Sequence, residues 1–190
     1  WPDDVRIVFK HRPLSFHDRA FPAAEASMAA NAQGKFWEFH DKLFTDKKFT
    51  DADLERYATE VGLDVAQYKA DLQSRKFEAI VTKHDEQSVA IGATGTPAFF
   101  VNGRKLSGAK PFPDFKALIE EELKKAQAMV KDGVAKADVY DTILKNAEAD
   151  KAANAPPTLD QKRNTFNLRN SPSMGAKSAR ATLVVFSDFQ

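Results

Sequence analysis

The sequence contains no cysteine among its 190 residues, and it carries almost no net charge. The absence of cysteine excludes disulfide bonds, thiol nucleophiles and thiolate metal sites within this chain. A formal net charge of +1 gives no electrostatic attraction for nucleic acid or for an anionic membrane surface. Apolar runs are only a few residues long, far short of a stretch that crosses a bilayer. These absences leave a globular protein without thiol chemistry of its own.

The residues that are present are typical of a folded domain with a substantial core. Hydrophobic residues make up 43% of the chain and charged residues 29%, which is the balance found in globular proteins. A chain of 190 residues is long enough for one good-sized domain, with or without additional elements. Because it begins with Trp1 rather than methionine, we expect it to be a segment of a longer protein.

The clearest local signal lies in the middle of the chain. Asn102 and Gly103 separate two strand-like runs, and an Asn-Gly pair favours a tight hairpin because both residues tolerate positive φ. Thr96 and Pro97 open the first run, where the missing N–H of a proline removes no ladder hydrogen bond. Gly95 on the approach indicates a sharp bend. The residues alone therefore predict a bend, a strand, a tight turn and a return strand.

Hydrophobic periodicity predicts a largely helical chain with strands near its two ends and in its middle. Strands are expected at 3–10 and 181–190, and the second has the near-continuous apolar run of a strand buried on both faces. Residues 152–163 predict a polar linker because they contain two prolines and little apolar character. Helices are expected at 23–31, 35–44, 54–61 (with Asp51 as the N-cap), 64–73, 77–91, 114–130 and 134–150.

Several segments together resemble the DsbA-like thioredoxin-fold thiol–disulfide oxidoreductases. Residues 5–17 are similar to the family's strand after the active-site helix, and 34–44 are similar to its helical subdomain. Residues 95–103 resemble its cis-proline loop and hairpin, and 170–190 resemble its opening strands. In that family, the residue after the position of Gln190 is the first cysteine of a Cys-Pro-x-Cys motif. The two parts of the domain therefore stand in permuted order, without the helix that carries the cysteines.

The resemblance implies an α/β architecture: a thioredoxin-like fold with a helical insertion and with its strands in permuted order. Residues 1–130 would be the C-terminal part of such a domain, with the insertion at about 15–91 and the cis-Pro hairpin at 95–109. Residues 131–165 would form a helix and a linker, and 166–190 the N-terminal strands. We favour a fragment of a tandem-repeat protein over an engineered permutant, because the proline pair in the linker is typical of an interdomain joint.

The same resemblance implies a thiol–disulfide oxidoreductase that acts on polypeptides in the periplasm or outside the cell and needs no cofactor. Thiol–disulfide exchange requires a thiolate, so this chain alone is expected to be redox-inactive. By resemblance, Gly95, Thr96 and Pro97 bind the substrate. The residues that would border the site are Ser187, Asp188, Phe189 and Gln190.

Plainer interpretations of these residues remain open. Pro97 can serve only to shape its strand, and 187–190 can be simply a buried strand end. The competing function is a non-catalytic thioredoxin-fold module that binds peptides or partner domains. We expect no metal site, because two histidines flank Pro13 in an expected loop and the others lie on different expected helices. The four histidines, for which packing or surface roles are expected, are His11, His17, His40 and His84.

The apolar strand near the C-terminus needs a partner, because unpaired apolar strands aggregate. We predict that 181–189 inserts in the sheet between the strand at 5–9 and the strand at 97–101. The insertion takes place either within the chain or by exchange with a second copy, which would give a strand-exchanged homodimer.

Overall fold

A computed structural model describes residues 1, 3–152, 163–165 and 167–190. The linker expected at 152–163 lies, from 153 to 162, outside the described residues. The chain divides into two compact units, which we name and describe separately. The sheet unit comprises Trp1–Phe9 and Pro97–Phe186, and the helical unit comprises Lys10–Thr96 and Ser187–Gln190.

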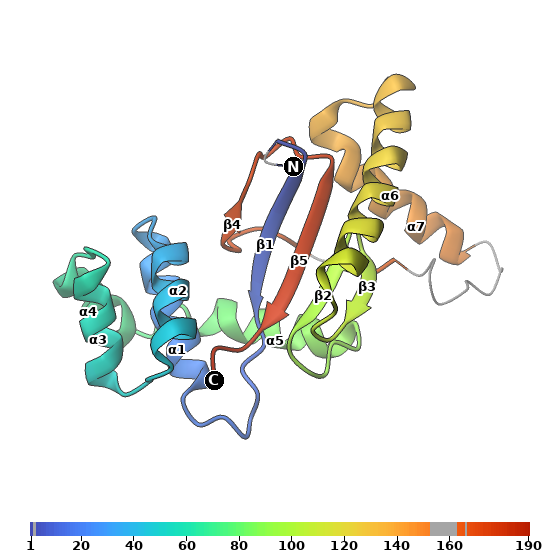
Figure 1. Cartoon of the computed structure of the whole chain (residues 1–190). Helices are drawn as coiled ribbons and strands as arrows, with labels where there is room; N and C mark the ends of the chain where they lie inside the picture. The colour runs from blue at the N-terminus through green and yellow to red at the C-terminus, as the bar shows by residue number, and fades with distance from the viewer. Residues whose placement is uncertain (2, 153–162, 166) are drawn as a thin grey trace. The chain divides into compact units, whose positions relative to one another are not determined.

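Five strands form one sheet in the order β3-β2-β5-β1-β4 (Figure 1). Their bounds are β1 Val5–His11, β2 Ala98–Val101, β3 Arg104–Ser107, β4 Ser173–Met174 and β5 Ala181–Ser187. Strand β5 pairs antiparallel with β2, and Figure 1 shows it running in the same direction as its other neighbour, β1. The strand order confirms the predicted insertion of the C-terminal strand between the other two.

The hairpin turn forms at the predicted pair, Asn102 and Gly103, whose φ angles are 45° and 85°. Asn102 is completely buried, and its side-chain oxygen accepts a hydrogen bond from the Thr182 N–H at 2.8 Å. The Asn102 N–H donates to the Thr182 carbonyl oxygen at 2.9 Å. The residue that makes the turn therefore also fixes the register of β5, because its backbone N–H and its side-chain oxygen both bond to Thr182.

An amphipathic helix covers the sheet. The helices of this unit are α6 (Phe112–Lys131) and α7 (Val139–Ala152), which follows a single 3-10 turn (Lys136–Asp138). Ile119 and Leu123 of α6 share a buried cluster with Val101 of β2 and Ala181 of β5. The start of α7 packs against the C-terminal half of α6, where Val139 and Ile143 share a buried cluster with Ala126. The expected break between the two helices occurs at Asp132 and Gly133.

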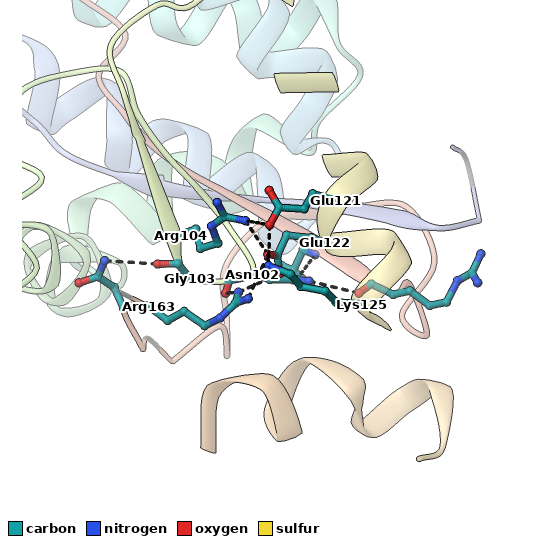
Figure 2. A network of polar contacts seen from close by, with 10 residues as sticks. Asn102, Gly103, Arg104, Glu121, Glu122, Lys125 and Arg163 are labelled. Carbon is teal, nitrogen blue, oxygen red and sulfur yellow. Dashed lines mark hydrogen bonds and ion pairs between the residues drawn. The ribbon is translucent and has the colours of Figure 1, made fainter. Parts of the chain in front are cut away.

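A buried carboxylate joins α6 to the hairpin and to the chain beyond the undescribed segment (Figure 2). Glu122 is fully buried and forms ion pairs with Arg104 at 3.0 Å and Arg163 at 2.8 Å. The Arg163 guanidinium also donates to the carbonyl oxygen of Asn102 at 2.7 Å. Burial opposes ionisation of Glu122, but the hydrogen bonds and charges of the two arginines hold its pKa below the usual value. The network fixes residue 163 at the hairpin turn.

Gly103 allows the chain to approach the turn closely. The Asn164 N–H donates to the Gly103 carbonyl oxygen at 2.8 Å. A Cβ atom on Gly103 would lie 2.7 Å from the Asn164 carbonyl oxygen, which is closer than real Cβ contacts. This position therefore requires glycine for space as well as for its positive φ.

Five short helices make up most of the helical unit. Their bounds are α1 Ala20–Ala32, α2 Phe36–Asp46, α3 Asp51–Glu60, α4 Val65–Gln73 and α5 Glu78–Ala90. Helix α1 is rich in alanine and buries eight of its 13 residues, which lets its neighbours pack close to its backbone. Phe39 of α2 lies with its ring centroid 6.2 Å from those of Tyr57 and Tyr68, so one aromatic cluster joins α2, α3 and α4.

One helix cap predicted in this unit, Asp51, is wrong. Asp51 is the first residue of α3 rather than its N-cap. The cap is Thr50, whose hydroxyl oxygen accepts a hydrogen bond from the Asp53 N–H at 3.2 Å. Asp64 caps α4 in the same way, through the Gln67 N–H at 3.0 Å. In the part of the chain that the structure describes, no helix combines the length and the apolar character needed to span a bilayer.

Candidate functional site

The three residues expected to bind substrate form the bend that leads into β2. Gly95 is exposed, whereas Thr96 and Pro97 are half-buried. The Pro97 carbonyl oxygen accepts a hydrogen bond from the Gly108 N–H at 3.2 Å, which closes the base of the hairpin. Ala98, the next residue, pairs with Phe186 near the end of β5. The start of β2, directly after the bend, is therefore paired with the end of β5.

A buried carboxylate organises the last residues of the chain. The Asp188 side chain is only 1% exposed, and its Oδ2 accepts a hydrogen bond from the Leu14 N–H at 2.8 Å. The same oxygen lies 3.0 Å from Nδ1 of His17, and Oδ1 accepts from the Gln190 N–H at 2.8 Å. Gln190 is exposed, and its side-chain oxygen accepts from the Arg19 N–H at 3.0 Å. Through these contacts, Asp188 holds the end of the chain against the segment that follows β1.

Arg12 connects this chain end to the loop before Thr96. The Arg12 N–H donates to the Ser187 carbonyl oxygen at 2.8 Å. Its guanidinium donates to the Thr94 carbonyl oxygen at 3.5 Å and forms an ion pair with Asp85 of α5. One residue thus holds two segments that stand 93 residues apart in the sequence, Thr94 and Ser187. Sequence reasoning missed Arg12, and its position directly before a proline at a strand end was the only signal.

Phe189 lies in a cluster of aromatic and histidine rings. It is 4% exposed, and its ring centroid lies 5.4 Å from Phe44, 5.9 Å from His40 and 6.0 Å from His11. His11 in turn stacks on His84 at 5.7 Å, with 25° between the ring planes. His11 was expected in a loop, but it is the last residue of β1 and is buried. Phe189 is thus a packing residue of the helical unit.

Two buried histidines of this cluster, His11 and His84, stay neutral at the pH where a histidine ordinarily titrates. Burial, with the nearby positive charge of Lys10, lowers the pKa of His11 far below its usual range. Burial and the neighbouring His11 do the same for the pKa of His84. Lys10 is 1% exposed, and burial together with Lys83 lowers its pKa to about 8. Among the described residues, no group of three or more side chains of the metal-ligating types is placed to hold a metal ion.

Comparison with known proteins identifies relatives of part of the chain. The Na(+)/H(+) antiporter NhaA 1 of Mycolicibacterium gilvum is 38% identical over 110 residues, which is 56% of this chain and 18% of that protein. The antiporter NhaA of Herminiimonas arsenicoxydans is 40% identical over 119 residues, or 62% and 19% of the two chains. NhaA 3 of Salinispora tropica is 40% identical over 106 residues, or 55% and 16%. The chain thus spans less than one fifth of the length of these relatives.

A family model identifies the fold more directly. The model of the DSBA-like thioredoxin domain matches residues 1–120. This match includes β1, the five helices of the helical unit and the hairpin that begins after Pro97. It confirms the resemblance drawn from the sequence and the α/β, thioredoxin-like class. The chain belongs to the family of DSBA-like thioredoxin domains.

Proposed function

We propose that this chain provides the substrate-binding part of a thiol–disulfide oxidoreductase that acts on extended polypeptides. The observation that carries the proposal is that Arg12 bonds to two distant segments. Its guanidinium donates to the Thr94 carbonyl oxygen, and its backbone N–H donates to the Ser187 carbonyl oxygen. The loop that leads to Thr96-Pro97 and the segment that ends at Gln190 are thereby fixed together. Membership of the DSBA-like family supports the chemical class.

The backbone of the bend is the part that would meet the substrate. An extended peptide binds a strand-like segment through main-chain hydrogen bonds, and these are insensitive to the peptide's side chains. Gly95 leaves the approach to Thr96 and Pro97 open, since it is exposed and has no side chain. Asp188 and Arg12 are positioning residues in this proposal, because their polar groups are occupied by the protein itself.

The chemistry itself needs thiols that these 190 residues lack. In exchange, a thiolate attacks one sulfur of a disulfide, forms a mixed disulfide and expels the other sulfur as a thiolate. The family's two cysteines follow the position of Gln190, and we propose that they do so in the full protein. The compartment would then be oxidising, such as a periplasm or the cell exterior.

The alternative is a module that binds peptides or partner domains without redox chemistry. The absence of cysteine from the whole of this chain favours it. The relatives are named as ion antiporters, and we do not extend that activity to this chain, which matches less than one fifth of their length. We propose instead that the matched region serves as a thioredoxin-like binding module.

An insulin-reduction assay on the full protein, with the residues that follow Gln190, separates the two functions. If the full protein is an oxidoreductase, it should accelerate the precipitation of insulin in the presence of a dithiol, and Pro97→Ala should slow that reaction. A full protein that binds peptides but leaves insulin soluble would support the binding module and contradict the oxidoreductase. Arg12→Met is the companion variant, because loss of its hydrogen bonds should lower the rate without removing any reacting group.

A further inference from the structure

A cavity of about 310 Å³ lies in the sheet unit, where β1, the start of α7 and the two segments that flank β4 come together. Its volume is at the lower end of the range for pockets that hold small ligands. The proposed exchange chemistry uses none of the residues around it. The side chains that give the cavity its chemical character are those of Arg6, Tyr140, Asp141, Leu168, Arg169 and Lys177.

The charge around this cavity is mainly positive, in a chain whose net charge is only +1. The cations are Arg6 of β1, Arg169 of the segment before β4 and Lys177 of the segment after it. The one carboxylate is that of Asp141, in the first turn of α7. None of these four side chains forms an ion pair in the part of the chain that the structure describes. The lining residues therefore carry a net of two positive charges that the protein itself does not compensate.

The absence of carboxylate partners sets this cavity apart from the rest of the chain. Seven of the nine arginines in the sequence form ion pairs with aspartate or glutamate. The two that have no such partner among the described residues are Arg6 and Arg169. They stand near opposite ends of the sequence, yet the fold brings both to the same cavity. This convergence favours a shared anionic ligand over two independent surface charges.

Arg6 is half-buried and has few hydrogen-bond acceptors around it. A guanidinium has five N–H donors, but that of Arg6 makes one hydrogen bond among the described residues, to the Thr182 hydroxyl at 3.3 Å. Its central carbon lies 5.9 Å from the centroid of the Tyr140 ring. The Nε atom is buried without a partner and is out of reach of a ligand, so an anion could meet only the terminal nitrogens. Partial burial of a charge without a counter-charge is costly, and an anion in the cavity would offset that cost.

We propose that this cavity binds a phosphate group. A phosphate monoester carries a charge of about −1.5 to −2 at pH 7 and three strong acceptor oxygens, which matches three cations with a net of two positive charges. Guanidinium groups bind phosphate oxygens in pairs, and a lysine adds a point charge. The volume beside Tyr140 and Leu168 leaves room for a small organic group, so the phosphate comes either from the free ion or from a small phosphorylated molecule. This site needs no thiol, so it stands independently of the proposed exchange activity.

The test is an NMR titration of the full 190-residue chain with phenyl phosphate, in about 0.15 M salt to screen exposed charges. We expect saturable amide shifts confined to the surroundings of Arg6, Tyr140, Arg169 and Lys177. The matched control is benzenesulfonate, which has the same ring and a tetrahedral head group with nearly one negative charge fewer. It should bind at least about tenfold more weakly, because a charge-assisted hydrogen bond is lost. Shifts scattered over the surface, or equal affinity for benzenesulfonate, would overturn the proposal.

Variants of the exposed cations locate the contact without disturbing the fold. Arg169 and Lys177 are both exposed, and we expect Arg169→Gln and Lys177→Gln each to weaken phenyl phosphate binding about tenfold. Arg169→Lys keeps the charge but lacks the planar fork, so it should recover only part of the affinity. Lys131→Gln is the matched control, because Lys131 is an exposed lysine at the end of α6, outside the cavity. Equal loss in the control variant, or no loss in Arg169→Gln and Lys177→Gln, would refute the site.

A parallel titration with inorganic phosphate separates the two sources of the phosphate group. Affinity for inorganic phosphate equal to or above that for phenyl phosphate would assign the cavity to the free ion. Tighter binding of phenyl phosphate, with additional shifts at Leu168, would assign it to a small phosphorylated molecule. Failure of both compounds to give saturable shifts at the cavity would contradict the proposal, and it would leave the proposed exchange activity untouched.

Discussion

The buried histidine pair His11 and His84 makes the protein sensitive to acid. Both side chains are nearly inaccessible, and burial holds the pKa of each far below the value of about 6.5 expected in an unfolded chain. At pH values under 6.5, the unfolded state takes up protons that the folded state does not. Stability is therefore full above pH 6.5 and falls as the pH is lowered toward the folded pKa values.

The magnitude follows from proton linkage. Each proton bound only by the unfolded state changes the free energy of unfolding by about 1.4 kcal/mol per pH unit. Two histidines give a slope approaching about 2.7 kcal/mol per unit in the middle of the window. A drop from pH 7 to pH 5 then removes about 3 to 4 kcal/mol, which is a large share of the stability of a typical domain.

Urea unfolding followed by far-UV circular dichroism between pH 7 and 5 measures this slope. The window avoids most carboxylate titration. The variant His84→Leu keeps an apolar side chain against His11 and should lose about half of the slope, whatever its effect on stability at pH 7. An unchanged slope in His84→Leu would refute the reasoning, because the acid sensitivity would then arise elsewhere.

Three further predictions concern single residues. Glu122→Gln should destabilise the protein by about 3 to 5 kcal/mol in urea, since it leaves two arginines without their buried carboxylate, whereas Glu120→Gln, which loses only a surface ion pair with Lys116, should cost under about 0.5 kcal/mol. Between pH 8 and 9, below the range in which tyrosines ionise, wild-type stability should rise by about 1 kcal/mol because the unfolded state alone keeps the Lys10 proton, and Lys10→Met should abolish that rise. Gly103→Ala should lower the melting temperature, because its Cβ would meet the Asn164 carbonyl; an unchanged value would contradict the close approach.

The sequence was sufficient to predict features that depend on local signals. The Asn102-Gly103 turn followed from residues that tolerate positive φ, and the burial of β5 followed from its continuous apolar run. Its place between β1 and β2 followed from the permuted order that the family resemblance implies, together with the need of an apolar strand for partners.

Other features depend on contacts between distant residues and could not be predicted from sequence. Arg12 meets Asp85 and Thr94 only because the fold brings them together, and its place before a proline does not predict these contacts. The burial of His11 depends on rings from α2 and α5, so the sequence, with Pro13 two residues further on, favoured a loop instead. Thr50 rather than Asp51 caps α3, a choice between neighbouring cap residues that composition cannot decide.

The central claim is that the bend at Thr96-Pro97 and the chain end at Gln190 meet a bound polypeptide together. Disulfide trapping with the variant Gln190→Cys tests it most directly, with an extended peptide whose cysteine carries a thionitrobenzoate leaving group. The protein thiolate attacks the peptide sulfur and releases thionitrobenzoate, whose absorbance gives the rate. We predict that Gln190→Cys traps the peptide at least about tenfold faster than the exposed control Glu86→Cys, because a bound peptide raises the effective concentration of the reacting groups. Adding Pro97→Ala to Gln190→Cys should remove this advantage. Equal rates for the two cysteine variants would contradict the account.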